Sequence, residues 1–297
     1  MSEPFTLRRI LVALDASAHS LAALEAAADL AAAMQAEIEG LFVEDINLIR
    51  LASLPFVREV RHTASLAALD LEQMERALKA QAAEARQALA EAAGRARVRW
   101  SFRVSRGHVA REVLAAASAA DLVTLGRQGR SARLGSPPAR LGSTALEALV
   151  GAPVALLLVE HRRAGVRGRH RGPGAGAGPE GGRPVLVVCD DSPGAARALD
   201  AAACLAEASG VALTILLLAD DGGATRELER GVARSLEGRS LEVRWRTVAL
   251  AEGGNLLRAL QSDEAPLVVL SLSSPRLSEV TVGKLLDHIT NPVLLIR

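Results

Sequence analysis

Three apolar segments of this sequence occur twice, in the same order. ILVALDAS (residues 10–17) returns as VLVVCDDS (185–192), RVRWSFRV (97–104) returns as EVRWRTVA (242–249), and APVALLLV (152–159) returns as NPVLLIR (291–297). A repeat on this scale indicates that one structural unit has been duplicated. We therefore expect two copies of one fold, each long enough to bury its own core.

A stretch rich in glycine and arginine separates the two copies. Residues 161–183 have no apolar periodicity, which predicts a linker rather than part of a packed core. The predicted domains are therefore 1–160 and 184–297. The first copy is the longer one, and much of its additional sequence lies within residues 46–75.

Each copy alternates apolar strand patterns with helical patterns, which is typical of a parallel sheet covered on both faces. In the first copy we expect Ser17 or Ser20 to cap the first helix, which runs to about Gln35. The expected strands are 9–14, 38–45, 97–104, 121–126 and 153–159, and the other expected helices are about 64–93, 109–119 and 142–150. The predicted class is α/β.

Composition and charge exclude several kinds of protein. The formal net charge is +1, from 35 basic and 34 acidic side chains, so no global field draws the chain to nucleic acid or to an acidic membrane. With four Phe, two Trp and no Tyr, the chain is also poor in side chains that stack on single-stranded nucleic acid. The apolar runs are far shorter than the ~20 residues of a membrane-spanning helix.

No export signal is recognisable at the N-terminus, so a cytoplasmic protein is expected. Cys189 and Cys204 form no CxxC or His/Cys cluster and are predicted to be buried structural thiols.

The chemistry of the chain is expected in the loop GRQGRSARLGSPPARLGST (126–144), which follows an apolar strand and precedes a helix. Gly126 and Gly129 would allow positive φ angles and close approach of a ligand to the backbone. Gly142 and Ser143 open a helix whose free N–H groups can hold an anion. Positive charge and hydroxyl donors complete this phosphate-binding pattern; they belong to Arg127, Arg130, Arg133, Arg140, Ser131, Ser143 and Thr144.

Asp15 ends the first strand and has two interpretations. In open parallel sheets, ligands bind beyond the carboxyl ends of the strands, where a carboxylate is suited to accept hydrogen bonds from ribose hydroxyls. The alternative is that Asp15 caps the following helix.

Together, ILVALDAS, LFVED, VTLG with the glycine loop, and APVALLLV resemble the universal stress protein family over residues 8–160. The second copy resembles the family from about residue 184 to 297. The family signature is matched in kind by Gly126, Gly129 and Gly142-Ser143. The twelve residues between Gly129 and Gly142 exceed the family spacing, and Pro137 and Pro138 stiffen the excess.

The resemblance implies ATP as the ligand, with or without Mg²⁺. Asp15 would contact the ribose, the backbone around Val43 the adenine, and the loop from Gly126 to Thr144 the phosphates. It also implies two Rossmann-like, doubly wound sheets of strand order 3-2-1-4-5. Their last strands, 153–159 and 292–297, would pair within the chain, giving a monomeric pseudo-dimer unless the protein forms a homodimer.

The second copy departs from the pattern. It keeps Asp190, but Ser271 and Ser274 stand where the first copy has Gly126 and Gly129. We therefore expect one nucleotide per chain, bound in the first copy.

Three functions remain open from the sequence. The first is an ATP-responsive module in stress response or signalling with a protein partner yet to be identified. The second is a nucleotide-independent scaffold that acts through its surfaces, particularly the additional helical segment at 46–93. There the side chains either form an exposed apolar patch or pack onto their own domain; they are Leu48, Ile49, Leu51, Leu54, Pro55 and Phe56. The third is a slow ATPase. Because no Walker lysine follows the glycines, a binding module is favoured over an enzyme.

Overall fold

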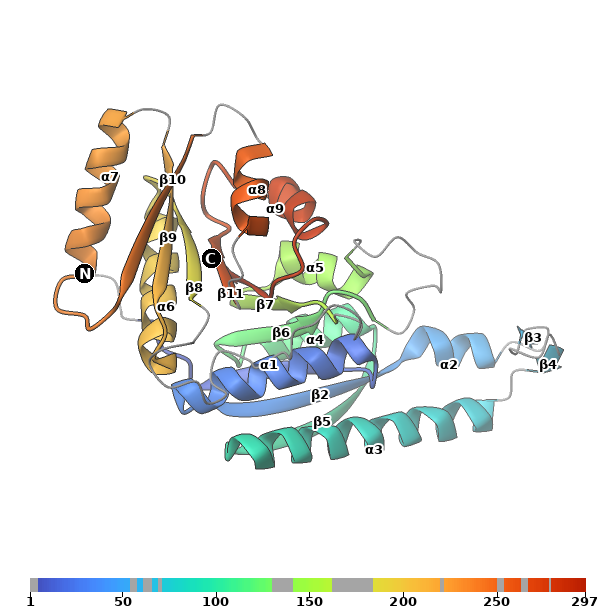
Figure 1. The fold of residues 1–297 in the computed structure, drawn as a ribbon. Helices are drawn as coiled ribbons and strands as arrows, with labels where there is room; N and C mark the ends of the chain where they lie inside the picture. The colour runs from blue at the N-terminus through green and yellow to red at the C-terminus, as the bar shows by residue number, and fades with distance from the viewer. Residues whose placement is uncertain are drawn as a thin grey trace.

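The structure of the protein is a computed structural model that describes residues 5–53, 58–60, 66–68, 71–129, 141–161, 184–219, 222–249, 254–262, 267–277 and 279–297. Nearly all of the predicted linker lies outside these residues. Figure 1 shows an extended sheet with helices on both of its faces.

One 10-stranded sheet runs through the molecule in the order β10-β9-β8-β11-β12-β7-β6-β1-β2-β5. Each half contributes five consecutive strands in the order 3-2-1-4-5, and within each half all pairs are parallel. The first half supplies β1 (Arg9–Leu14), β2 (Glu37–Asp45), β5 (Trp100–Gly107), β6 (Leu122–Gly126) and β7 (Ala155–Val159). The second supplies β8 (Val185–Cys189), β9 (Leu213–Ala219), β10 (Val243–Ala249), β11 (Leu267–Ser271) and β12 (Val293–Ile296). The expected fold class and strand order are confirmed.

The helices form two layers around two apolar cores. One core lies beneath α1 (Ala18–Met34), α3 (Leu71–Ala96), α6 (Pro193–Ser209) and α7 (Gly222–Ser235). The other lies beneath α4 (Val109–Ala117), α5 (Ser143–Gly151), α8 (Gly254–Ser262) and α9 (Glu279–Leu286). Because both faces of the sheet are covered, the central strands carry continuous apolar runs instead of alternating residues.

The two halves join where β7 and β12 pair antiparallel. Leu156, Leu157 and Leu158 lie opposite Leu295, Leu294 and Val293 respectively, and all six residues are buried. The pairing satisfies the backbone groups of what would be two edge strands, and it continues both cores across the junction. The predicted intramolecular pairing of the last strands is confirmed.

Local sequence explains the ends of the first helix in each half. Ser17 is the N-cap of α1 and accepts a hydrogen bond from the Ser20 amide, and Gln35 ends the helix in the left-handed region. In α6 the same positions are taken by Ser192, followed by Pro193 at the first turn, and by Gly210 with φ of 64°. Of the two expected caps of α1, Ser17 is the one used, and it is Ser17 rather than Asp15 that caps the helix.

The insertion in the first half differs most from expectation. The helix expected at 64–93 begins only at Leu71, and the short strands β3 (Arg58–Val60) and β4 (Leu66–Ala68) precede it. A further short helix, α2 (Ile46–Ala52), follows β2 and exposes Leu48 and Leu51, whereas Ile49 packs against the core. Residues 54–56, the rest of the expected apolar surface, lie outside the described residues.

Cys189 ends β8 and is buried, and burial raises the pKa of its thiol to about 12. Cys204 is half-buried in α6. No helix in the described part of the chain has the length and apolar character needed to cross a membrane.

Candidate nucleotide site

The strand register brings Asp15 and Val43 to the same edge of the sheet. Leu14, the last residue of β1, pairs with Phe42 of β2, so Asp15 and Val43 occupy the next positions along neighbouring strands. Asp15 Oδ1 accepts a hydrogen bond of 3.0 Å from the Ser17 amide, which holds the carboxylate beside the first turn of α1. Both residues therefore stand at the carboxyl edge of the sheet, where open α/β folds place their ligands.

The backbone between Asp15 and Ser17 is strained. Ala16 has a φ of 55°, a conformation in which its Cβ crowds the backbone, and its counterpart Asp191 in the second half does not share this conformation. Strained residues of this kind cluster at functional sites. The strained backbone at Ala16 is therefore a further feature that marks this edge of the sheet as a candidate site.

Gly126 is required because a helix approaches it closely. A Cβ at this position would lie 2.8 Å from both the carbonyl carbon and the Cβ of His19, in the first turn of α1. Gly126 is therefore a packing glycine, and what approaches its backbone is α1. The expected positive φ is wrong for Gly126 and Gly129, because neither of them lies in the left-handed region.

Gly129 and Gly142 bring the two ends of the glycine loop together. A Cβ on Gly129 would lie 3.1 Å from Asp15 Oδ2, and one on Gly142 would lie 3.6 Å from the Gly129 nitrogen. The Gly142 amide also donates a hydrogen bond of 2.7 Å to the Arg127 carbonyl. Asp15, Gly129 and Gly142 thus form one contiguous surface.

The N-terminus of α5 opens directly from this surface. Gly142 is the N-cap and has no side chain to accept from the first amides of the helix. The N–H groups of Ser143, Thr144 and Ala145 precede the first intrahelical bond, which Leu146 donates to Gly142. Ser143 is exposed and Thr144 half-buried. The helix end combines amides, two hydroxyls and a positive dipole end, which together suit an anion.

The side chain of Arg127 serves a different purpose from the one its position suggested. Its guanidinium is only 4% exposed and donates to the carbonyls of Leu286 at 2.9 Å and Asn291 at 2.6 Å, and to that of Ile289. These carbonyls belong to the last residue of α9 and to the segment that follows it, in the other half of the molecule. Burial lowers the pKa of Arg127 to about 10, while Glu160, at 3.4 Å, opposes the shift. Arg127 therefore joins the halves and does not face the loop glycines.

The loop between Gly129 and Leu141 is not part of the description. Arg130, Ser131, Arg133, Pro137, Pro138 and Arg140 all belong to residues 130–140, outside the described residues.

A histidine pair borders the site and was missed by the sequence reasoning, which singled out only His108. The rings of His19 and His161 meet edge to face, with centroids 5.8 Å apart, and the His161 amide donates to His19 Nδ1 at 3.1 Å. Burial, followed by the neighbouring His161, lowers the pKa of His19. The neutral ring therefore carries its proton on Nε2. His108 is the N-cap residue of α4 and makes no side-chain capping bond.

The equivalent position in the second half is closed by serines. Asp190 is buried and accepts hydrogen bonds from the Ser192 amide at 3.0 Å, from the Ser192 hydroxyl and from the Ser274 hydroxyl. Ser274 replaces Gly129, so its side chain lies on the carboxylate where the first half leaves only a backbone.

The neighbouring contact is also exchanged between the halves. The first half packs Gly126 against His19, whereas the second packs Ser271 against Gly194, whose Cβ would collide with the Ser271 hydroxyl. In both halves a glycine makes room for the residue that faces it. The glycine is on the strand, β6, in the first half and on the helix, α6, in the second.

Comparisons with known proteins agree with this architecture. The sequence profile of the universal stress protein family matches residues 6–160. A universal stress protein from Archaeoglobus fulgidus DSM 4304 is 18% identical with a TM-score of 0.72, and the match covers 99% of each chain. A functionally unknown protein from Pseudomonas aeruginosa PAO1 is 16% identical with a TM-score of 0.53, covering 98% of this chain and 92% of that one.

The cytoplasmic domain of a prokaryotic cation chloride cotransporter is 11% identical with a TM-score of 0.52, covering 98% of this chain and 95% of that one. No curated protein matches the chain. At these identities the solved structures show a shared fold, and that fold occurs in proteins of different roles. Because the family profile spans more than half of the chain, the protein belongs to the universal stress protein family.

Proposed function

We propose that the first half binds ATP and that the protein is a nucleotide-responsive module of stress response or signalling, with one site per chain. The observation that carries this proposal is the contiguous surface of Asp15, Gly129 and Gly142 beside the uncapped N-terminus of α5. It offers a carboxylate for hydroxyl groups and helix amides for an anion.

The resemblance to the universal stress protein family suggests how the contacts with the nucleotide would be divided, and the position of these residues at one edge of the sheet supports it. Asp15 would accept from the ribose hydroxyls, and the backbone at Val43, on the neighbouring strand, would border the adenine. The amides and hydroxyls of Ser143 and Thr144 would hold phosphate oxygens, and Gly126 would keep β6 close against α1. Among the described residues, no group of three or more His, Cys, Asp or Glu side chains could hold a metal ion. Any Mg²⁺ would take phosphate oxygens and water among its ligands.

Binding at this loop would also act on the second half of the molecule. Arg127 lies between the loop glycines, and its backbone carbonyl holds Gly142 while its side chain holds the carbonyls after α9. A shift of the loop on nucleotide binding would therefore change these contacts. This gives the protein a physical route from nucleotide occupancy to its surface, as a signalling module requires.

Binding without fast turnover is favoured over catalysis. The nearest histidine, His19, uses Nδ1 as an acceptor and carries its proton on Nε2, so it would donate to a ligand instead of acting as a base.

Titration calorimetry of nucleotide-stripped protein with ATP tests the proposal. Asp15→Asn removes the charge without changing shape, and Gly129→Val places a side chain against Asp15 without a backbone collision, so both variants are expected to fold and to lose at least tenfold in affinity. Asp191→Asn, on the exposed edge of the second half, is the matched control and keeps wild-type affinity. Wild-type affinity in both test variants would refute the site.

A second candidate function is a nucleotide-independent scaffold. It is favoured by α2, where Leu48 and Leu51 are 41% and 44% exposed on an element without a counterpart in the described part of the second half. Such side chains are typical of contact surfaces. Leu48→Ser with Leu51→Ser would then abolish partner capture while leaving ATP binding unchanged.

A further inference from the structure

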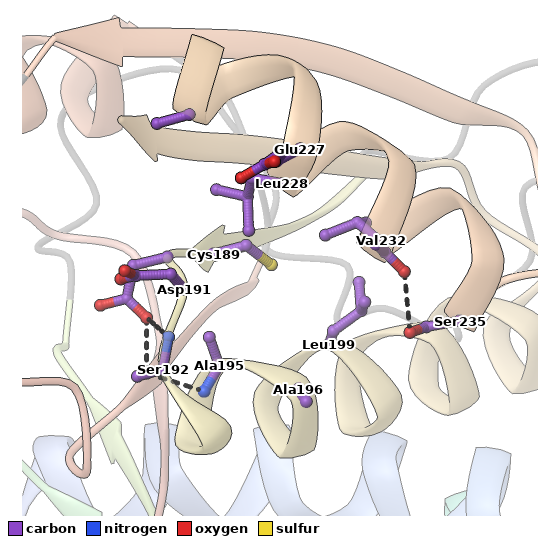
Figure 2. A pocket seen from close by; sticks show the side chains of 13 residues that line it. Cys189, Asp191, Ser192, Ala195, Ala196, Leu199, Glu227, Leu228, Val232 and Ser235 are labelled. Atoms are coloured by element: carbon purple, nitrogen blue, oxygen red, sulfur yellow. Dashed lines mark hydrogen bonds between the residues drawn. The ribbon is translucent and has the colours of Figure 1, made fainter. Parts of the chain in front are cut away.

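The second half contains a pocket of about 410 Å³ between α6 and α7, away from the glycine loop of the first half. Figure 2 shows Glu227 and Leu228 of α7 above Cys189, with Ala195, Ala196 and Leu199 of α6 forming the opposite wall. Its volume falls within the range of small-molecule sites, roughly 300–1,000 Å³.

The pocket exists because α7 covers its side of the sheet incompletely. In the first half the corresponding long helix, α3, buries Leu78, Ala82, Ala85 and Leu89 in the core. In α7, Val232 is the one buried residue among those whose side chains are described. Gly231 adds to the space, because a Cβ built on it would meet no heavy atom within 4 Å.

The interior of the pocket is apolar and does not suit an anion. Leu199, Leu228 and Val232 line it together with the Cys189 thiol, whose raised pKa keeps it protonated. The polar groups at the start of α6 are already hydrogen-bonded within the protein. Ser192 Oγ accepts from the Ala195 amide at 3.2 Å, and Asp190 accepts from Ser192 and Ser274. Little of this helix end remains to bind phosphate.

The rim of the pocket is acidic. Asp191 and Glu227 lie on opposite walls, and neither lysine nor arginine is among the lining residues in the described chain. Asp191 already forms an ion pair with Arg276, whose Nε lies 3.7 Å from Asp191 Oδ1. Glu227 has no ion-pair partner among the described residues. Arg230, one turn further along α7, folds back to donate to the Arg226 carbonyl at 3.2 Å.

We propose that this pocket binds a small organic cation, an apolar body carrying one ammonium group. The apolar body would fill the space beside Leu199, Leu228 and Val232, and the ammonium group would lie at the rim against Glu227. Charge complementarity selects this class over carboxylates and phosphates of the same size. The site is independent of the proposed nucleotide site.

Three phenylbutyl probes of similar length test the proposal on the full chain: 4-phenylbutylamine, 4-phenylbutan-1-ol and 4-phenylbutyrate, each titrated by ligand-observed NMR. We expect the amine to bind about fivefold more tightly than the alcohol, and the carboxylate to bind most weakly. Glu227→Gln should remove the advantage of the amine and leave the alcohol unchanged. Glu229→Gln, on α7 but outside the lining, should change neither.

A pocket-filling variant separates this site from unspecific binding. Gly231→Leu occupies the empty space and replaces a helical glycine, so the fold should be retained while all three probes lose their affinity. Gly94→Leu fills equally open space on α3 and should have no effect on binding.

Any of three results would overturn the proposal: no binding of the amine to the wild-type chain at millimolar concentration, equal binding of amine and carboxylate, or undiminished binding of the probes to Gly231→Leu. Asp15→Asn should leave the amine affinity unchanged, so the two proposed sites succeed or fail separately.

Discussion

The guanidinium of Arg127 donates a hydrogen bond of 2.9 Å to the main-chain carbonyl of Leu286, across the junction between the two halves of the chain. Arg127 lies in the glycine loop of the first half, and Leu286 is the last residue of α9 in the second. Two further carbonyls, of Ile289 and Asn291, accept from the same side chain. The loop and the far half are therefore mechanically connected.

Replacing Arg127 with Met should destabilise the protein by about 2–4 kcal/mol, because two buried carbonyls, one partly buried carbonyl and Glu160 lose their cationic partner. Chemical denaturation measures the change. Arg76→Met, which removes an ion pair whose side chains are 70% and 80% exposed, is the control and should cost less than about 0.5 kcal/mol. Equal losses in the two variants would show that Arg127 does not join the halves.

The two outer glycines of the loop should respond differently to alanine. Gly126→Ala places a Cβ 2.8 Å from the His19 backbone and should cost about 1–3 kcal/mol. Gly142→Ala meets its nearest atom at 3.5 Å and should cost at most about 1 kcal/mol, since Ala is a poorer N-cap than Gly. Thermal unfolding of both variants measures the difference. A Gly142→Ala variant as unstable as Gly126→Ala would contradict the packing described here.

Acidification should destabilise the protein partly through His19. The pKa of His19 is lowered in the folded state, so the unfolded chain binds a proton more readily. Stability is therefore complete above the unfolded value of about 6.5 and declines as the pH falls below it. His19→Asn, which keeps an acceptor for the His161 amide but does not titrate, should show a weaker decline between about pH 7.5 and 5.5. An unchanged pH profile in this variant would exclude His19 as the source.

Ser274, which donates a hydrogen bond to the buried carboxylate of Asp190, should be important for stability. Ser274→Ala leaves the buried carboxylate of Asp190 without one of its hydrogen bonds and should cost about 1–3 kcal/mol. Ser101→Ala, on the exposed start of β5, serves as the control in the same denaturation experiment. Similar stability of the Ser274→Ala variant and the wild-type chain would mean that Ser274 is dispensable to the fold.

Much of the fold is predictable from the repeated segments, because buried parallel strands are continuous apolar runs that end in recognisable turns. ILVALDAS and VLVVCDDS became β1 and β8 with serine-capped helices after them, as their patterns indicate. The late start of α3 was not predictable, because residues 64–70 share the alanine and leucine content of the helix that follows. Within this segment Leu66–Ala68 form β4 by pairing with β3, which lies outside the local pattern.

The candidate site was predictable at Asp15, Gly129 and Gly142, since strand ends and helix starts are readable from local sequence. The role of Arg127 was not, because its partners lie more than 150 residues away and are main-chain carbonyls that carry no sequence signal. The contact of His19 with His161 was missed because the two residues are 142 positions apart in the sequence and only the fold brings them together. The closure around Asp190 in the second half was indicated by the sequence, because serines replace the loop glycines at positions 271 and 274.

We expect the first half of the molecule to bind nucleotide and the second half not to bind it. Titration calorimetry of the nucleotide-stripped full chain with ATP and Mg²⁺ is the decisive experiment, because affinity and stoichiometry are read together. The expected result is one site per chain, lost in Asp15→Asn and retained in Asp191→Asn. Two equivalent sites per chain, or no binding at all, would refute the difference between the halves.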